Sequence, residues 1–390
     1  MLEQVKGQET TVRMLKSELQ KDVLPPTLLF YGPDGSGKFL TAVEVARILN
    51  CEAFGKDKDS PNGCTCPSCT RIRNLSSENL YIIERSNLKN VFDIWKLSGI
   101  THQNVGNFIF DLKRLIYLLL DPRESKSEES ESDTSNRRSK KGDFESERKY
   151  FEEIIRNPFE IIEKQEALFE TIDQVLSSFR KYIIVLEHIR ELQRFLNLKS
   201  STGKPRVTII NGAENMNEEA SNRLLKTSEE PPENAYIILI SKNIDLMRET
   251  VKSRCMRYRF KPIGESLMAE IIEEKTGFRP AEDMIKWDSD NEKLERIYLE
   301  LVKEKERFEK LYQLIEQILS DELLVDFLYY TIRKLREEIL KKEEKSISRI
   351  YTIETIIKEA ARIINGIQHG NLNPETSLID FALNYLAPNI

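Results

Sequence analysis

The sequence predicts an α/β fold built on a parallel sheet, with a phosphate-binding loop near the N-terminus and a helical C-terminal part. Residues 32–38 match the pattern G-x-x-x-x-G-K, and they lie between an apolar run at 27–31 and a helical pattern. Further runs typical of buried strands occur at 80–83, 207–210 and 236–240, and a helical segment precedes each of the last two. This alternation is typical of a parallel sheet covered by helices.

In chain order, residues 1–86 read as helix, strand, loop, helix, cysteine-rich module and strand. The α/β pattern resumes near residue 183 with an amphipathic helix ending at Leu196. Beyond Phe260 the pattern is almost wholly helical, with Glu/Lys-rich faces and apolar stripes. One such stripe contains Leu311, Leu314, Ile315 and Ile318. We interpret it as the core of a helix bundle rather than as a cofactor site.

Length and composition restrict the class of protein. A chain of 390 residues is long for one core, so two or three domains are expected. A net charge of −6 creates no overall attraction for nucleic acid, although a local basic patch is compatible with it. No run of about 18 apolar residues occurs, and the N-terminus lacks the apolar core of a signal peptide. We therefore expect a cytoplasmic protein with reduced thiols and no membrane partner.

The phosphate loop provides the candidate nucleotide-binding residues. Its glycines let backbone N–H groups turn toward phosphate oxygens, and the lysine adds a positive charge at the β- and γ-phosphates. These residues are Gly32, Gly35, Ser36, Gly37 and Lys38.

The residue after Lys38 is Phe39, where the pattern has Ser or Thr to hold Mg²⁺. An accidental glycine-rich turn is the alternative, and the flanking strand and helix argue against it. The loop leaves ATP binding open, but hydrolysis is not expected.

The residues that follow the strand at 207–210 also indicate that the chain does not hydrolyse ATP. Phosphate-loop ATPases place an Asp that supports Mg²⁺ and a Glu that activates water at the end of a neighbouring strand. Here Asn211 offers one neutral oxygen, Gly212 has no side chain, and Glu214 lies two positions further on. With Phe39, three groups needed for metal-assisted hydrolysis are missing.

Four of the five cysteines lie close together, at Cys51, Cys64, Cys66 and Cys69. In a reducing compartment this grouping favours a structural Zn²⁺ site with four thiolate ligands over disulfides. The C-x-C spacing is tighter than the usual C-x₂-C, and incidental thiols on a surface loop are the alternative.

Residues 87–182 interrupt the α/β pattern. We interpret them as an insertion in which two helical segments flank a disordered stretch at 121–148. That stretch is rich in Ser and in charges of both signs, and it has too few apolar residues to bury a core.

At residues 211–216 and 224–232 the chain reads N-G-A-E-N-M and L-L-K-T-S-E-E-P-P. It is similar there to the A-D-x-M…L-L-K-x-L-E-E-P-P stretch of bacterial clamp-loader subunits, the AAA+ proteins of the DNA polymerase III holoenzyme. Residues 5–8 resemble the family's opening V-x-G-Q, and residues 253–255 resemble its S-R-C motif. The cysteine module is also a family feature.

The resemblance covers residues 1–86 and 183–265 well and the tail weakly. No counterpart can be placed for residues 87–182. The resemblance implies three domains. These are an AAA+ phosphate-loop core at 1–260, with the cysteine module at 51–69, a helical lid at 261–298, and a helical collar at 299–390.

Two subunit types of this family compete as interpretations. The gamma/tau motor hydrolyses ATP, whereas the delta-prime stator keeps the arginine finger and commonly has a degraded nucleotide site. Phe39, Asn211 and Gly212 make this chain resemble delta-prime. The implied partners are gamma/tau and delta subunits, the sliding clamp, and primed DNA contacted through the assembled complex. The alternatives are the motor itself and an AAA+-derived scaffold outside replication.

The resemblance also assigns roles to two further residues. Arg254, in the S-R-C motif, would reach the γ-phosphate of a neighbouring subunit, because its planar cationic fork suits phosphate oxygens. The alternative is a surface arginine in the basic run at 252–259. Ser241, after the last predicted strand of the core, occupies the family's sensor position.

Overall fold

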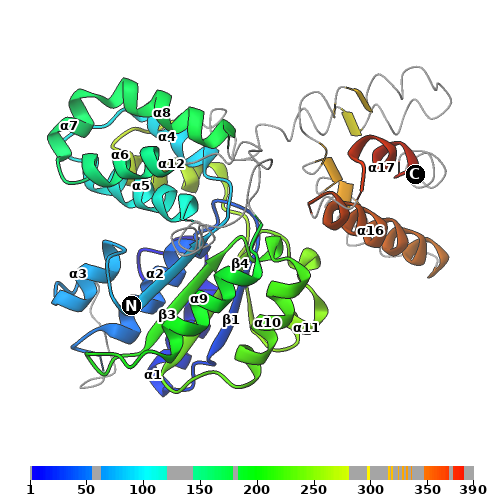
Figure 1. The fold of residues 1–390 in the computed structure, drawn as a ribbon, viewed down its shortest axis with the longest axis horizontal. Helices are drawn as coiled ribbons and strands as arrows, with labels where there is room; N and C mark the ends of the chain where they lie inside the picture. Colours follow the sequence, from blue (N-terminus) through cyan, green and yellow to red (C-terminus); the bar gives the residue numbers. More distant parts are fainter. Residues whose placement is uncertain are drawn as a thin grey trace, which may run out of the picture. The chain divides into compact units, whose positions relative to one another are not determined.

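The computed structural model describes residues 2–54, 63–120, 144–178, 183–280, 297–298, isolated positions between 315 and 335, 347–368 and 372–381. The chain forms two compact units, Met1–Ile285 and Lys286–Ile390 (Figure 1). The first unit contains the sheet, the phosphate loop and the cysteines. Within the described residues, no helix has the length and apolar character needed to cross a membrane.

The sheet has five parallel strands in the order β2-β3-β4-β1-β5. They are β1 (Thr27–Tyr31), β2 (Leu80–Glu84), β3 (Arg206–Asn211), β4 (Ala235–Ser241) and β5 (Met256–Arg259). The predicted parallel α/β sheet is thereby confirmed, and the first four strands lie where the sequence predicts them. β5 is an additional strand, and its pattern is weak because Tyr258 alone of its four residues is buried.

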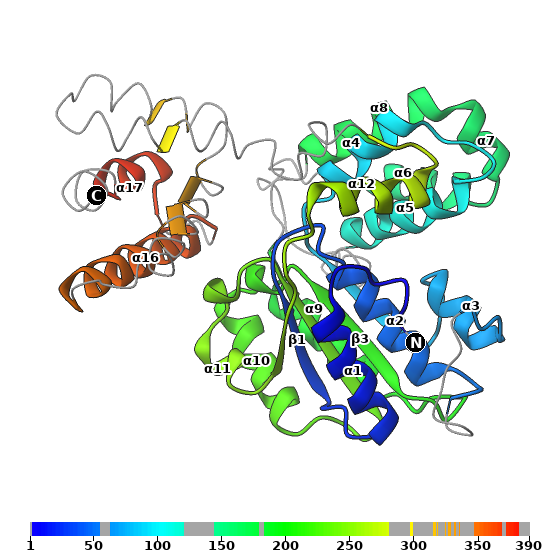
Figure 2. The ribbon, with the colours of Figure 1, turned by 180° about the vertical axis from the view of Figure 1, so that it is seen from behind.

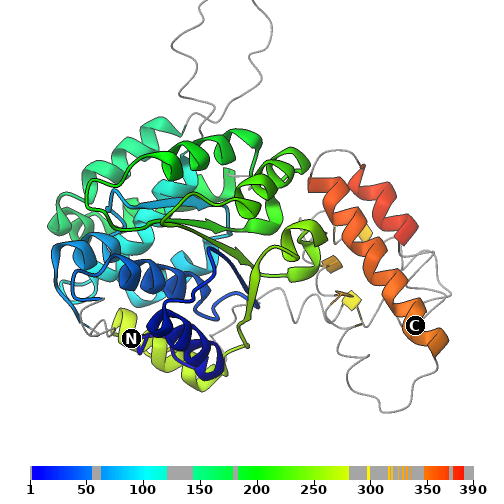
Figure 3. The same cartoon turned by 90° about the horizontal axis from the view of Figure 1, so that it is seen from below.

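Alternate residues of each strand face two separate helical layers, as the period of two in a strand requires. Leu28 and Phe30 of β1 pack in a cluster with α1 (Glu9–Lys21) and α2 (Lys38–Asn50). Leu29 packs in the opposite cluster with α9 (Leu186–Asn197), α10 (Glu218–Glu229) and α11 (Glu249–Lys252). Figures 1 and 2 show these two layers from opposite sides, and Figure 3 shows them from below.

The insertion is a helical subdomain with its own core. Its helices are α4 (Lys89–Ser98), α5 (Val105–Leu119), α6 (Glu145–Ile154), α7 (Pro158–Glu163) and α8 (Gln165–Ser178). The rings of Trp95 and Phe108 meet edge to face at 5.4 Å in this core. They form two groups along the chain, α4 with α5 and α6 to α8, where the sequence predicts two helical segments. Of the stretch expected to be disordered, 121–143 lies outside the described residues, and the chain is helical from Glu145.

Helix α12 (Glu265–Thr276) connects the insertion with the N-terminal segment. Nζ of Lys275 lies 2.5 Å from the buried carboxylate of Asp111. Nδ2 of Asn104 donates to the carbonyl oxygen of Thr276 at 2.6 Å. Lys6 pairs with Glu270 at 2.7 Å. Of the expected lid at 261–298, residues 281–296 lie outside the described residues.

The described residues of the second unit are helical except at Leu372 and Asn373. This unit contains α16 (Ile347–Gln368) and α17 (Pro374–Phe381), which pack together near Gly366 and Leu372. In the predicted stripe, Ile315 and Ile318 are helical and buried, while Leu311 and Leu314 lie outside the described residues. In the first unit, the short helix α3 (Pro67–Arg73), which contains Cys69, packs on α2.

Candidate nucleotide, metal and phosphate-binding sites

The phosphate loop joins the carboxyl end of β1 to the first turn of α2. Gly32 has φ 148°, Gly35 has φ 72° and Gly37 has φ 86°, which are conformations that favour glycine. A Cβ on Gly32 would lie 2.2 Å from the carbonyl oxygen of Phe260, so a side chain there would require a backbone shift. All three glycines therefore have a backbone conformation that other residues rarely adopt.

Lys38 is buried and hydrogen-bonded within its own loop. Its Nζ donates to the carbonyl oxygens of Gly32 (2.6 Å) and Pro33 (2.5 Å) and lies 3.3 Å from Oγ of Ser36. Oγ of Ser36 in turn donates to the carbonyl oxygen of Pro33 at 2.6 Å. Burial lowers the pKa of Lys38, and the nearby charge of Asp34 opposes this shift. An incoming phosphate would have to replace the carbonyl oxygens as acceptors for the ammonium group.

The ends of three neighbouring strands bring the other candidate residues next to the loop. Ser241 ends β4 beside Tyr31 of β1, and its carbonyl oxygen accepts a hydrogen bond from the amide of Gly32 at 3.2 Å. The Ser241 hydroxyl is occupied by a turn, because it donates to the carbonyl oxygen of Asn243 at 2.9 Å and accepts from its amide. A sensor role would need this turn to open.

Gly212 leaves no room for the acid that an ATPase has near this position. Its φ is 83°, and a Cβ would lie 2.4 Å from the carbonyl oxygen of Arg85. An acidic side chain at residue 212 would therefore require β2 and β3 to separate locally. The backbone conformation at Gly212 thus excludes the missing carboxylate, and a single substitution would not restore it.

Glu214 lies near the loop, but it is buried and poorly satisfied. Its Oε1 accepts a hydrogen bond from the amide of Lys242 at 3.3 Å, and its Oε2 has no hydrogen-bond partner among the described residues. Burial raises the pKa of Glu214, and the positive charge of Lys242 opposes this shift. A carboxyl group with a raised pKa in this setting is poorly suited to bind Mg²⁺.

Phe39 is the second residue of α2, and its side chain belongs to the hydrophobic core. Its ring meets that of Phe110 edge to face at 6.0 Å, and the guanidinium carbon of Arg114 lies 4.2 Å from its centroid. Nε of Arg114 lies 3.0 Å from Oε2 of Glu84, the last residue of β2. Nδ2 of Asn211 donates to Oε1 of the same carboxylate at 2.7 Å. Phe39 stands where the motif has its hydroxyl, and Asn211 stands where an ATPase has its first acid. Both residues contact the ion pair between Arg114 and Glu84.

The four clustered cysteines are brought together at the far end of α2. Their sulfur atoms all lie within 4.8 Å of one another, and those of Cys51 and Cys64 are 3.7 Å apart. Tetrahedral Zn–S bonds of about 2.3 Å place sulfur atoms roughly 3.8 Å apart, whereas a disulfide is about 2 Å long. Burial raises the pKa of the Cys69 thiol, a cost that a bound cation would reverse. The donor set therefore fits Zn²⁺.

Arg47 is a buried cation next to this cluster. Its Nη1 donates to Sγ of Cys69 at 3.4 Å, and its Nε pairs with Glu44 at 2.9 Å. Arg73 donates to the carbonyl oxygen of Cys64 at 2.6 Å. In the sequence, Arg47 is a charged residue within a largely apolar helical segment. In the structure nearly every residue of that helix is buried.

Arg254 lies away from both sites, just before β5. The amino end of β5 aligns with that of β1, since Met256 pairs with Leu28. The phosphate loop follows the opposite end of β1, about 10–15 Å away along the strand. Arg254 is partly exposed and pairs with Glu229 of α10 at 2.6 Å. Arg254 therefore lies at the opposite end of the sheet from its own phosphate loop.

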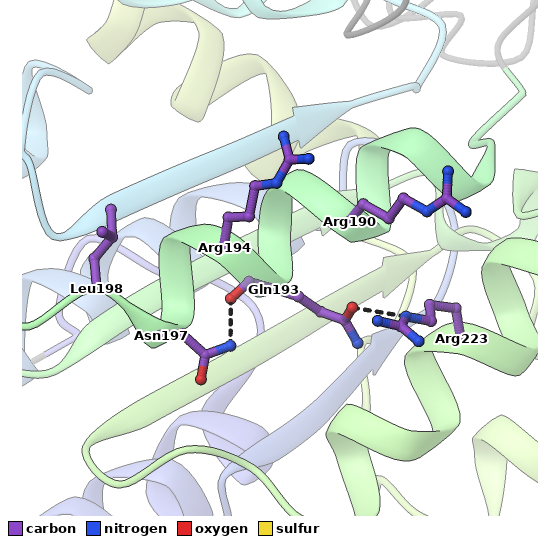
Figure 4. A pocket seen from close by; sticks show the side chains of 6 residues that line it. All are labelled: Arg190, Gln193, Arg194, Asn197, Leu198 and Arg223. Atoms are coloured by element: carbon purple, nitrogen blue, oxygen red, sulfur yellow. Dashed lines mark hydrogen bonds between the residues drawn. The ribbon is translucent and has the colours of Figure 1, made fainter.

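A groove between α9 and α10 carries a concentration of positive charge (Figure 4). It has a volume of about 720 Å³. Nε of Arg223 donates to Oε1 of Gln193 at 2.7 Å, and Arg190 pairs weakly with Glu187 at 3.4 Å. The lining residues are Arg190, Gln193, Arg194, Asn197, Leu198 and Arg223. Arg190 and Arg194 are four positions apart on one helix, a spacing that could have revealed this basic face in the sequence.

Comparison with known proteins places the chain in a family. A family model described as "DNA polymerase III, delta subunit" matches residues 7–113 and 129–264. These ranges cover more than half of the 390 residues. The chain belongs to this family. The matched ranges extend over most of residues 87–182, for which the sequence alone offered no counterpart.

Members of the DNA polymerase III subunit families also match parts of the chain. The gamma/tau subunit of Mycoplasma pneumoniae is 27% identical over 113 residues, which are 29% of this chain and 15% of that protein. The delta' subunit of Pseudomonas aeruginosa is 31% identical over 99 residues, which are 25% and 30% of the two chains. The matched segments thus span less than a third of these relatives.

A gamma subunit-related protein of Thermotoga maritima is similar in structure at 18% identity. The match covers 53% of this chain and 81% of that chain, with a TM-score of 0.24.

Several residues of the candidate sites were not indicated by sequence patterns. They are Glu84, Arg114, Arg47 and the arginines of the groove. Arg114 and Glu84 are 30 residues apart and Arg47 and Cys69 are 22 apart, so only the fold reveals these contacts.

Proposed function

We propose that this chain is a non-hydrolysing, stator-like subunit of a bacterial clamp loader, which helps to load the sliding clamp onto primed DNA. The observation that carries the proposal is the state of the hydrolysis site. Phe39 is part of the hydrophobic core, Asn211 hydrogen-bonds Glu84, and residue 212 has no room for a side chain. Restoring a motor site would therefore require backbone changes as well as new side chains.

The role of Arg254 in the proposal is to act on a neighbouring subunit. It precedes β5, at the end of the sheet opposite the phosphate loop of its own chain, and its guanidinium is accessible. An arginine at a neighbour's γ-phosphate stabilises the charge that develops in the transition state. In the free subunit Glu229 holds this side chain, and assembly would exchange that carboxylate for phosphate oxygens.

The groove between α9 and α10 supports contact with DNA in the assembled complex. Three arginines and two amide side chains line it, and such groups bind phosphate oxygens of a nucleic-acid backbone without reading its sequence. Zn²⁺ on the four cysteines would be structural, because all four ligands come from the protein. A cytoplasmic location follows from the proposed role in replication.

The test is reconstitution of the complex with gamma/tau and delta subunits from the same source. With Arg254→Ala, ring assembly and thermal stability should stay near wild type. ATP hydrolysis stimulated by clamp and DNA should fall, because one motor site loses a cationic partner whose counterparts elsewhere contribute about 10³–10⁵ in rate. The fall should be partial, since other sites would use arginines of motor subunits.

Arg248→Ala is the matched control. Arg248 lies on the same segment, is similarly exposed, and also pairs with a carboxylate of α10, that of Glu218 at 3.1 Å. Unchanged stimulated hydrolysis and clamp loading with Arg254→Ala would contradict the proposed finger. Steady-state ATP hydrolysis by the isolated wild-type chain, abolished by Lys38→Ala, would favour the gamma/tau motor. Failure to co-assemble with clamp-loader subunits would favour a scaffold outside replication.

A further inference from the structure

The phosphate loop keeps the groups that recognise phosphate, while the groups that hold Mg²⁺ are replaced. We propose that Arg114 is the built-in cation of this site, and that the site binds a nucleoside di- or triphosphate without a divalent metal. The inference rests on the proposed non-hydrolysing role and names the ligand state of the same site. It does not depend on Arg254, which would act on another subunit.

The first observation is the contact between Arg114 and Phe39. In a phosphate-loop ATPase the residue after the lysine presents a hydroxyl to Mg²⁺. Here that residue presents an aromatic face, and the guanidinium carbon lies 4.2 Å from the ring centroid. A cation over an aromatic face is attracted by the negative potential of the ring. The substitution that removes a metal ligand therefore creates a binding surface for an organic cation.

The second observation concerns the place of the lost aspartate. Asn211 ends β3 directly beside Glu84 of β2. The Glu84 carboxylate is fully buried, and both of its oxygens are used. Oε1 accepts from Asn211 (2.7 Å) and from the Ser86 hydroxyl (2.6 Å), while Oε2 pairs with Arg114 at 3.0 Å. The Arg114 side chain thus lies between Phe39, at the position of the motif's hydroxyl, and the Glu84 carboxylate that Asn211 contacts at the position of the acid.

The carboxylates near Arg114 are already paired with cations. Arg114 pairs with the buried carboxylate of Glu84 at 3.0 Å and lies 3.7 Å from that of Asp111. Lys275 pairs with Asp111 as well. An added dication would find no free oxygen on Glu84 and would be repelled by a guanidinium that cannot lose its proton.

The phosphate-recognising part of the loop remains. The three glycines keep positive φ, Lys38 starts α2, and the helix is long enough to present a positive end. A free polyphosphate can therefore be bound by backbone N–H groups and by the ammonium group of Lys38. A polyphosphate already complexed with Mg²⁺ brings a charge for which this site has no ligands.

The experiment is calorimetric titration of the full-length wild-type chain with ADP and with ATP, in EDTA and in excess Mg²⁺. We expect binding in EDTA, weakened by Mg²⁺ by about tenfold because the metal complex is the poorer ligand. Lys38→Ala should abolish binding in both buffers. Tighter binding in Mg²⁺, or no binding in EDTA, would overturn the proposal.

Arg114→Gln tests the residue itself. It frees the Glu84 carboxylate to act as a metal ligand, so Mg²⁺ should now tighten nucleotide binding instead of weakening it. Arg114→Lys keeps the positive charge and should keep the wild-type response. An unchanged response with Arg114→Gln would show that Arg114 is not the cation. Should Arg114→Gln fail to fold, as judged by circular dichroism, the wild-type and Arg114→Lys titrations still decide. None of these outcomes alters the ring assay with Arg254.

Discussion

At the scale of single residues, burial explains how Glu214 differs from a metal-binding acid. Its carboxyl group has one weak hydrogen bond and one oxygen without a hydrogen-bond partner among the described residues. Ionising such a group in a buried place costs free energy, and this cost is what raises its pKa. Because its pKa is raised, Glu214 should make the folded protein less stable as the pH increases.

We predict that Glu214→Gln stabilises the protein at alkaline pH. The folded-state pKa is raised above the reference value of 4.5, so the native state holds the proton more tightly than the unfolded state. The stabilising contribution of the protonated form is complete below that value and is lost as the pH rises. The melting temperature of the variant minus that of wild type should become more positive between about pH 5 and about pH 8. Glu219→Gln, at an exposed position of α10, is the control. A constant difference across this range would contradict the prediction.

What the sequence reveals at this scale depends on whether the interacting groups are neighbours in the chain. The phosphate loop, Phe39, Gly212 and the four cysteines are short sequence patterns. In the structure the loop glycines have positive φ and the four sulfur atoms lie within 4.8 Å of one another. Arg114 and Glu84 are 30 residues apart, and Arg47 and Cys69 are 22 apart. No local pattern connects such pairs, because the packing of α5 and α3 against the core creates the contacts.

At the scale of elements, helix α2 connects the two candidate sites. Lys38 begins it and Cys51 caps its other end, about 20 Å away for a helix of this length. Arg47, near the second end, donates to Cys69. Four thiolates around Zn²⁺ leave a net charge of about −2, which is costly to bury unless a cation offsets it. Arg47 supplies that cation from the helix that carries the phosphate loop.

We therefore predict that Arg47→Gln weakens Zn²⁺ binding while leaving the four ligands in place. The loss of a second-layer hydrogen bond to a metal ligand typically costs about 10–100-fold in affinity. Competition with a chromophoric chelator measures it. The matched control is Arg73→Gln, because Arg73 donates to a backbone oxygen of the module and to none of its sulfurs. Equal losses for both variants would mean that Arg47 acts through packing alone. Absence of Zn²⁺ from wild-type protein purified without chelator would contradict the site itself.

The second element-scale feature is the basic face formed by α9 and α10. It is unusual in a chain of net charge −6, so its three arginines stand out against an acidic background. Arginine contacts to DNA phosphates release counterions, and each contact contributes about 0.9 to the slope of log K against log salt concentration. Replacing Arg190, Arg194 and Arg223 by Gln should lower the slope for primed DNA by roughly two to three in the assembled complex.

The control for this prediction removes the same charge elsewhere. Arg148, Lys149 and Lys164 lie on the insertion, where each pairs with a glutamate on its own helix or on the helix before it. Their replacement by Gln changes the net charge equally, and the slope should stay at its wild-type value. A slope that falls by the same amount in both triple variants would indicate overall charge, and the groove would lose its proposed role.

The strands and helices differ in how well sequence patterns predict them. Strands β1 to β4 are apolar runs and are predicted correctly, whereas β5 has exposed Met256, Arg257 and Arg259 and is recognised only by its pairing with β1. In the insertion, a second set of aromatic and leucine side chains forms a core separate from the two beside the sheet. The sequence indicates helical segments on both sides of residues 121–143, but the shorter helices have too few turns to show a period of their own.

At the scale of the whole molecule, the two compact units suggest a division of labour. The first, Met1–Ile285, contains every candidate site residue. In the second, Lys286–Ile390, the described residues are helical except at Leu372 and Asn373. We propose that the second unit is the collar through which the subunit enters the ring. The boundary at residue 285 falls inside the range expected for the helical lid, so a chain ending there keeps α12 and its contacts with Asp111 and Lys6.

We predict that a chain ending at Ile285 folds but does not assemble. Its hydrophobic clusters beside the sheet and in the insertion lie wholly before that residue, so Zn²⁺ content and thermal unfolding should match those of the first unit in the full chain. Binding to gamma/tau and delta subunits in gel filtration should be lost.

A point variant keeps this test independent of truncation. In the full chain, a Cβ at Gly366 would lie 2.3 Å from the side chain of Leu372, so Gly366→Val should disturb the packing of α16 on α17 alone. It should weaken ring entry while Zn²⁺ content is unchanged. If the shortened chain enters the ring as well as the full chain does, the oligomerisation surface must lie on the first unit, and the basic groove and the surface around Arg254 become the places to look for it.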